Sequence, residues 1–146
     1  MKNLNFLFVF TILAVLVSCG KDDNKDNQAP YIEVMAPTED QMFLRGGHLT
    51  LDAIFQDNEA LKECRVNLLF DEAMPDTLKS ATGIDLPWEP IEMVIPLSET
   101  YQEVTNLVLF GDQIPIEIQS GYYNLQFDVY DLAKNPARHS VRVFIN

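Results

Sequence analysis

Four stretches of this chain alternate apolar and polar residues with a period of two. They are residues 49–55, 64–70, 123–129 and 141–145. Successive side chains of a β-strand point to opposite faces, so this period predicts strands with one buried face. Three further strands are predicted where apolar residues gather without strict alternation, at residues 31–34, 91–97 and 107–118. Pro96 and Pro115 mark the ends, edges or bulges of the last two.

The spacing of these strands indicates an all-β fold. Gly, Pro, Asn and Asp separate the strands, and no segment of ten residues has the period of an amphipathic helix. About seven short strands with such turns are typical of an antiparallel β-sandwich. We expect residues 29–146 to form this single domain, since their number is close to the commonest domain size.

Two local patterns narrow the sandwich to the immunoglobulin-like type. Gly121-Tyr122-Tyr123 has the form of a tyrosine corner, in which the phenol of Tyr123 bonds back to the preceding backbone. Residues 131–135 resemble the Asp-x-Ala-Gly-Asn hairpin turn that precedes the last strand of bacterial immunoglobulin-like domains, with Lys134 in place of the glycine. We expect Asn135 to take the positive φ that this turn requires.

The N-terminus has the features of a secretory signal. Lys2 precedes an apolar run over residues 6–17, which is shorter than the roughly 20 residues of a membrane-spanning helix. The ending Leu16-Val17-Ser18-Cys19 resembles the lipobox of bacterial lipoproteins. This resemblance implies removal of residues 1–18 and lipidation of Cys19, with residues 19–28 as a short polar tether. An uncleaved segment with an ordinary thiol is the alternative.

The residues after the lipobox predict the cellular location of the protein. Lys21-Asp22-Asp23 resembles the surface-export signal of Bacteroidetes lipoproteins, although three such residues can also be a solvated charge run. With the sandwich motifs, this N-terminus resembles a single-domain, immunoglobulin-like lipoprotein family of Bacteroidetes whose function is uncharacterised. The resemblance implies a lipid-anchored domain on the outer membrane, facing the cell surface. It supplies no catalytic residues.

Charge and cysteine content exclude several classes of function. The formal net charge is −12, which opposes binding to nucleic acid and to anionic membrane surfaces. If Cys19 is lipidated, Cys64 has no partner for a disulfide, and its alternating context predicts a small buried side chain. No nucleophile–histidine motif, phosphate loop or zinc-ligand spacing is present, so we predict that the protein is not an enzyme.

Topology places oxygen-bearing side chains at one end of the predicted sandwich. The loop after the second strand and the last hairpin meet there, near the start of the domain. Calcium takes six to eight oxygen ligands, and cadherin-like sandwiches gather theirs at such an end. The candidate ligands are Asp57, Asn58, Glu59, Asp131 and Asn135. The favoured alternative is that Asp57 and Asp131 cap their own turns without a metal.

The long connection over residues 71–90 is the second candidate site. Long loops in compact domains often bind ligands. Trp88 could present its ring to a glycan or a peptide, or it could fold back and close the open end of the core, which we favour. Thr77 follows Asp76 in a pattern that resembles a bacterial O-glycosylation acceptor. The sequence thus predicts a surface module that recognises a glycan or a protein, or else a structural component of a cell-envelope complex, with calcium as an optional stabiliser.

Overall fold

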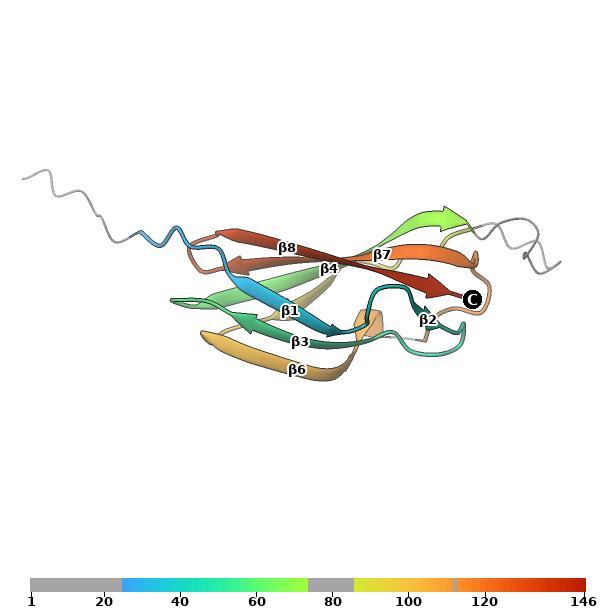
Figure 1. Ribbon diagram of the computed structural model, residues 1–146, viewed down its shortest axis with the longest axis horizontal. Helices are drawn as coiled ribbons and strands as arrows, with labels where there is room; N and C mark the ends of the chain where they lie inside the picture. Colours follow the sequence, from blue (N-terminus) through green and yellow to red (C-terminus); the bar gives the residue numbers. More distant parts are fainter. Residues whose placement is uncertain (1–24, 74–85, 112) are drawn as a thin grey trace, which may run out of the picture.

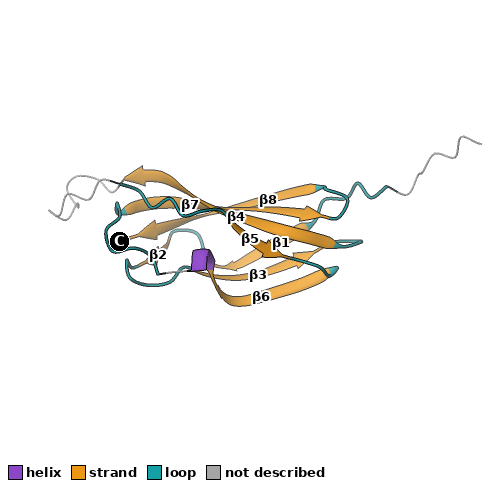
Figure 2. Ribbon diagram, turned by 180° about the vertical axis from the view of Figure 1, so that it is seen from behind, coloured by secondary structure: helices purple, strands orange, loops and turns teal. Residues whose placement is uncertain are grey.

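A computed structural model describes residues 25–73, 86–111 and 113–146, and it is a two-sheet β-sandwich (Figure 1). One sheet has three strands in the order β1-β3-β6, and the other has five in the order β2-β8-β7-β4-β5. The strands are β1 (Tyr31–Ala36), β2 (Gln41–Phe43), β3 (Thr50–Gln56), β4 (Leu61–Ala73), β5 (Met93–Pro96), β6 (Tyr101–Val108), β7 (Gly121–Asp131) and β8 (Pro136–Ile145). Figure 2 shows the same two layers from behind. The predicted sandwich is confirmed.

The alternating stretches form the core as predicted. The inward positions of β3, β4, β7 and β8 come together between the sheets, and nearly all of them are fully buried. The largest of these side chains are Tyr123, Phe55 and Phe127. Their burial removes the apolar face of each sheet from water, which is the main force holding the two layers together.

The ends of β4 and β6 differ from the prediction. The predicted strand over residues 107–118 is wrong, because β6 ends at Val108 and a short 3-10 turn follows at Leu109–Gly111. Phe110 and Gly111 have φ values of 59° and 74°, which lie outside the β region, so two successive residues turn the chain away from the extended conformation. β4 continues to Ala73, so the connection predicted to begin at residue 71 begins after Ala73.

The short strand β2 was not predicted, and its pairing is parallel rather than antiparallel. Gln41, Met42 and Phe43 lie beside Val143, Phe144 and Ile145 of β8. Three residues are too few for a sequence period. The other strand pairs of the described residues are antiparallel.

The tyrosine corner is confirmed, whereas the expected conformation of the last hairpin is wrong. The Tyr123 hydroxyl donates a hydrogen bond to the Gln119 carbonyl oxygen at 2.6 Å. In the β7–β8 turn the positive φ of 72° belongs to Lys134, not to Asn135. The backbone and side chain of Asn135 instead donate to the Asp131 carboxylate, and Lys134 takes the left-handed position that closes the turn.

The sandwich has two distinct ends. The N-terminal segment from Lys25 enters at the end that carries the β3–β4 loop and the β7–β8 hairpin (Figure 1). The C-terminus and β2 lie toward the opposite end. Each end carries one of the candidate sites described below.

Candidate functional site

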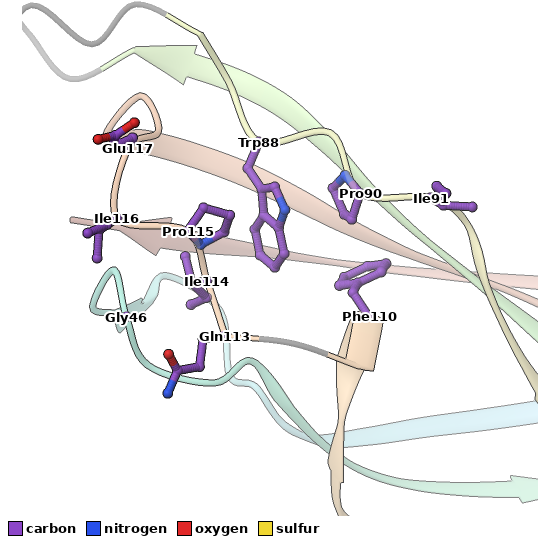
Figure 3. Close-up of a pocket in the computed structure, with 10 residues that line it drawn as sticks. All are labelled: Gly46, Trp88, Pro90, Ile91, Phe110, Gln113, Ile114, Pro115, Ile116 and Glu117. Atoms are coloured by element: carbon purple, nitrogen blue, oxygen red, sulfur yellow. The ribbon is translucent and has the colours of Figure 1, made fainter.

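An open groove of about 860 Å³ lies beside Trp88, away from the N-terminal end of the sandwich (Figure 3). Trp88 comes from the connection before β5, and Phe110 comes from the 3-10 turn after β6. Residues 113–117, from the connection before β7, complete the wall. Apart from Gln113 and Glu117, the lining residues are apolar or glycine.

Trp88 is fixed by contacts on two sides. Its backbone N–H donates to the Tyr123 hydroxyl at 3.2 Å. Its ring meets Phe110 edge-to-face, with centroids 5.6 Å apart and an interplanar angle of 77°. An aromatic pair of this geometry contributes about 0.5–1.5 kcal/mol beyond area burial. The indole is therefore held in one orientation at the groove.

The indole of Trp88 combines features of both predicted alternatives. It is half-buried and packs against the core, as a residue closing the sandwich would. It also lines the groove and points into it (Figure 3).

Large apolar side chains are exposed at the rim of the groove. Ile91 is 91% exposed and Ile116 is 68% exposed. Leu86, close in sequence to Trp88, is 76% exposed. Ile91 and Ile116 stand on opposite sides of the groove (Figure 3), and exposed apolar residues gathered around one groove mark contact surfaces more often than isolated ones do.

The polypeptide turn at Gly46 shapes the floor of the groove. Gly46 has a φ of 80°, and its N–H donates to the Ile114 carbonyl oxygen at 2.7 Å. The Ile114 N–H in turn donates to the Gly47 carbonyl oxygen at 2.8 Å. A left-handed φ favours glycine, so this residue type allows the turn to dock on the segment after β6.

The second candidate site is an acidic cluster, made of Asp26, Asp57 and Asp131, at the N-terminal end. One carboxylate oxygen from each residue lies within 4.8 Å of the other two. Asp57 and Asp131 are buried, with exposed fractions of 8% and 0%, and Asp26 is half-buried. Like charges at this separation repel unless hydrogen-bond donors or a cation offset them.

Both predicted turn caps are present in the acidic cluster. Asp57 Oδ2 accepts hydrogen bonds from the backbone N–H groups of Glu59 and Ala60, at 3.0 and 2.9 Å. Asp131 Oδ1 accepts from the backbone N–H of Asn135 at 2.7 Å. These bonds fix the two loops, but each carboxylate can accept further hydrogen bonds or bind a cation through its remaining lone pairs.

Two carboxylate oxygens of the acidic cluster are buried and find no hydrogen-bond partner in the part of the chain that the structure describes. They are Asp57 Oδ1 and Asp26 Oδ2. Within the described residues, no lysine or arginine forms a salt bridge with any member of the cluster. A buried acceptor without a donor is costly, so these two atoms need a further partner.

Asp26 is the member of the cluster that the sequence does not reveal. It belongs to the polar stretch predicted as a tether, where nothing marks one acid among several. In the fold, Asp26 Oδ1 accepts from Asn58 Nδ2 at 3.1 Å, and its carbonyl oxygen accepts from Asn135 Nδ2 at 3.3 Å. The backbone N–H of Gln28, followed by the side-chain amide of Asn58, holds the pKa of the Asp26 carboxyl below its ordinary value.

The remaining predicted ligands play different roles. Asn58 and Asn135 border the cluster and donate to its carboxylates through their side-chain amides. The Glu59 side chain is exposed and is not a member of the cluster. Only Asp57 and Asp131, of the predicted set, contribute clustered carboxylates.

Cys64 has the environment of a structural thiol. It is fully buried in β4, and burial together with the nearby charge of Asp128 raises the pKa of its thiol to about 12. A thiol nucleophile requires the thiolate form, which this environment disfavours. The predicted small, buried role of Cys64 is confirmed.

The predicted N-terminal and glycosylation residues lie outside the described residues. They are Cys19, Lys21, Asp22, Asp23 and Thr77. Of the helices that the structure describes, none has the length and apolar content to cross a bilayer.

One family profile, described as "Domain of unknown function (DUF4625)", matches residues 17–146. The chain belongs to the DUF4625 family. This family membership agrees with the predicted uncharacterised single-domain family, and the match covers the whole sandwich. No curated protein matches the chain.

Proposed function

We propose that this protein is a surface-exposed outer-membrane lipoprotein whose sandwich acts as a non-catalytic recognition module. The observation that carries the proposal is the groove beside Trp88, bounded by exposed Ile91 and Ile116. The lipobox and the Lys21-Asp22-Asp23 signal support the location.

The chemistry of the groove favours an apolar protein segment over a glycan. A sugar presents many hydroxyl groups, each of which needs a hydrogen-bond partner when it leaves water. The lining offers few polar side chains, Gln113 and Glu117, between walls of isoleucine, proline and aromatic rings. Apolar side chains of a partner would instead bury the exposed rim without leaving polar groups unpaired.

A recognition role also fits the lack of chemistry at the groove. Its lining, as far as the structure describes it, contains no histidine, cysteine or serine, and Glu117 stands alone among apolar neighbours. General acid–base and nucleophilic catalysis both need paired groups within hydrogen-bond distance. We therefore assign the groove to binding.

The binding test uses the single tryptophan of the chain as the reporter. A displayed peptide library is panned against the full-length protein in detergent. We expect the recovered peptides to be rich in apolar residues and to shift the fluorescence of Trp88. Their affinity should fall at least about tenfold, or 1.4 kcal/mol, in Ile116→Asp.

Leu132→Asp is the matched control for the peptide experiment. Leu132 is 66% exposed, almost as much as Ile116, but it lies in the β7–β8 hairpin at the other end of the sandwich. Equal loss of affinity in both variants would show a non-specific charge effect. Failure to recover any peptide, or a fluorescence response to maltohexaose instead, would count against a protein partner.

The location is tested separately by protease shaving of intact cells. We expect the wild-type protein to be cleaved and a variant carrying Lys21→Ala, Asp22→Ala and Asp23→Ala to be protected. Protection of both forms would contradict the surface address and favour a periplasmic role.

A second candidate function is that of a structural component of a cell-envelope complex, stabilised by Ca²⁺. The observation that favours it is the acidic cluster at the end where the N-terminal segment enters. Carboxylate oxygens are the ligands that Ca²⁺ prefers in proteins. An ion there would stiffen the base of the sandwich.

A further inference from the structure

The acidic cluster joins three separate parts of the chain. Asp26 lies in the N-terminal segment, Asp57 follows β3, and Asp131 ends β7. The first of these residues is seven positions after the predicted lipid-bearing Cys19. Any ligand held by all three carboxylates would therefore connect the segment nearest the membrane to the body of the sandwich.

Asp57 has a buried acceptor that the described residues leave unsatisfied. Asp57 is more than nine-tenths buried, and its two capping hydrogen bonds both go to Oδ2. Its other oxygen, Oδ1, is buried and has no partner among residues 25–73, 86–111 and 113–146, and the same is true of Oδ2 of Asp26. If turn capping were the whole purpose of these residues, one oxygen of each would not be left without a donor. A cation held among the three carboxylates, each of which has one oxygen within 4.8 Å of the other two, would offset their mutual repulsion.

A small cavity of about 200 Å³ borders the cluster on the side of Asp57. It is lined by Asp57, Asn58 and Gln28 among others, whereas Asp26 and Asp131 do not line it, so it offers space for water beside the three carboxylates. Calcium completes its shell of six to eight oxygens with water and tolerates irregular geometry, whereas Mg²⁺ demands a near-ideal octahedron. The cluster contains carboxylates and no histidine or cysteine, which disfavours zinc.

We propose that one Ca²⁺ ion binds Asp26, Asp57 and Asp131 and thereby clamps the N-terminal segment to the sandwich. This inference rests on the second candidate function, because it gives the proposed calcium site a further role. The site would join the N-terminal segment, which leads to the membrane anchor, to the sandwich domain. With calcium bound, the domain is held at its base in one orientation relative to the segment that leads to the membrane. Without calcium, the repulsion among the three carboxylates favours release of Asp26.

Calcium binding is tested on the full-length protein in detergent, by comparing melting in about 10 mM CaCl₂ with melting in EDTA. This concentration exceeds the dissociation constants of about 10⁻⁴–10⁻³ M that are typical of extracellular calcium modules. We expect calcium to raise the melting temperature by several degrees in the wild type. Asp57→Asn should lose this shift, although its amide oxygen can still accept the two capping bonds.

The clamp is tested by cleavage after Lys25 with lysyl endopeptidase, followed by mass spectrometry. We expect calcium to slow this cleavage at least about tenfold in the wild type, because the segment is held by Asp26. Asp26→Asn should abolish the protection, and it cannot unfold the domain through a lost strand contact because Asp26 precedes β1.

Glu99→Gln is the matched control for both readouts. Glu99 is an exposed acid in the β5–β6 connection, and its backbone contacts Leu61 near the same end of the sandwich. This variant should keep the melting shift and the protection. A melting shift in the wild type without protection at Lys25 would overturn the clamp while supporting the calcium site. No melting shift, or an equal shift with NaCl of the same ionic strength, would overturn both.

Discussion

The Tyr123 hydroxyl bridges Trp88 and Gln119. It accepts a hydrogen bond from the backbone N–H of Trp88 at 3.2 Å and donates one to the Gln119 carbonyl oxygen at 2.6 Å. The ring of Tyr123 is fully buried and meets Phe70 edge-to-face, with centroids 5.2 Å apart. A single core residue thus positions the connection before β5 and the connection before β7, which together form much of the groove.

Replacing Tyr123 with phenylalanine should destabilise the fold and loosen the groove. The change removes one hydroxyl but leaves the Trp88 N–H and the Gln119 carbonyl oxygen without their partner. We expect a loss of about 1–3 kcal/mol in the free energy of unfolding, measured by urea denaturation. The fluorescence of Trp88 should also shift to the red as its connection gains freedom.

Tyr130→Phe is the control for this prediction. Tyr130 lies on the same strand, and its hydroxyl makes no hydrogen bond among the described residues. The control should change stability by no more than about 0.5 kcal/mol. Equal effects of the two substitutions would show that the tyrosine corner contributes nothing specific.

Leu68 and Leu69 provide a direct test of the two-sided β4 strand. They are neighbours in sequence but point to opposite faces, with exposed fractions of 5% and 51%. We expect Leu68→Ala to cost about 2–5 kcal/mol, because it opens a cavity between the sheets. Leu69→Ala should cost well under 1 kcal/mol. Similar losses in chemical denaturation would contradict the register of β4.

The thiol of Cys64 should be unreactive in the folded protein. Burial raises its pKa from 9.0 to about 12, so almost no thiolate forms at pH 8. In Cys19→Ser, which leaves Cys64 as the only cysteine, we expect a negligible rate of reaction with Ellman's reagent until urea is added. Rapid labelling of the native variant would place Cys64 at the surface instead.

The ion pair of Arg142 and Asp40 should make stability depend on acid pH. Arg142 donates to both carboxylate oxygens of Asp40, at 2.7 and 3.1 Å, and these bonds hold the pKa of Asp40 below its ordinary value of 3.8. A lowered pKa in the folded state means that the stabilisation is complete above pH 3.8 and is lost as the pH falls through the folded value. Arg142→Gln should therefore lower the melting temperature at pH 7, and the difference from the wild type should narrow below about pH 4.

Glu39 Oε1 also lies 4.0 Å from Arg142 Nε, so every protein in this comparison carries Glu39→Gln. When Asp40→Asn is added, the effect of Arg142→Gln should not change with pH, since both acidic partners of Arg142 are gone. A difference that still narrows in acid would assign the pH dependence to another carboxylate.

Lys134 occupies a backbone conformation that suits glycine better. Its φ of 72° costs a residue with a side chain roughly 1–2 kcal/mol. We expect Lys134→Gly to raise the stability by about 0.5–1 kcal/mol, after allowing for the greater freedom of glycine in the unfolded chain.

Asn135→Gly is the contrasting change in the same turn. It removes the side-chain hydrogen bond to Asp131 Oδ2, measured at 2.6 Å, and it should lower the stability in thermal unfolding. Stabilisation by Asn135→Gly would mean that the amide of Asn135 does not contribute to the turn.

The β-sheet core could be predicted from the sequence because its signal is local. Residues 123–129 alternate apolar and polar positions, and every apolar one is buried in β7. Burial on one face of a strand requires this period, so the sequence itself carries it. The short strand β2 carries no such signal, because its three residues are held by pairing with β8.

The candidate sites could be predicted only in part. Asp57 and Asp131 stand out because each follows a strand and begins a turn, and Trp88 stands out as the only tryptophan. Asp26 does not, since it is one of several acids in a polar stretch. The groove partners of Trp88 were also missed, because Phe110 belongs to a segment predicted as strand and found as a 3-10 turn.

The sequence by itself determined the strand periodicity, the tyrosine corner and the buried character of Cys64. Each depends on side chains and neighbours a few positions apart, which a linear pattern records. The tertiary structure decided which distant residues meet: Asp26 with Asp57 and Asp131, and Trp88 with Phe110. These contacts follow from how two sheets pack and where three connections end, and no local propensity encodes that arrangement.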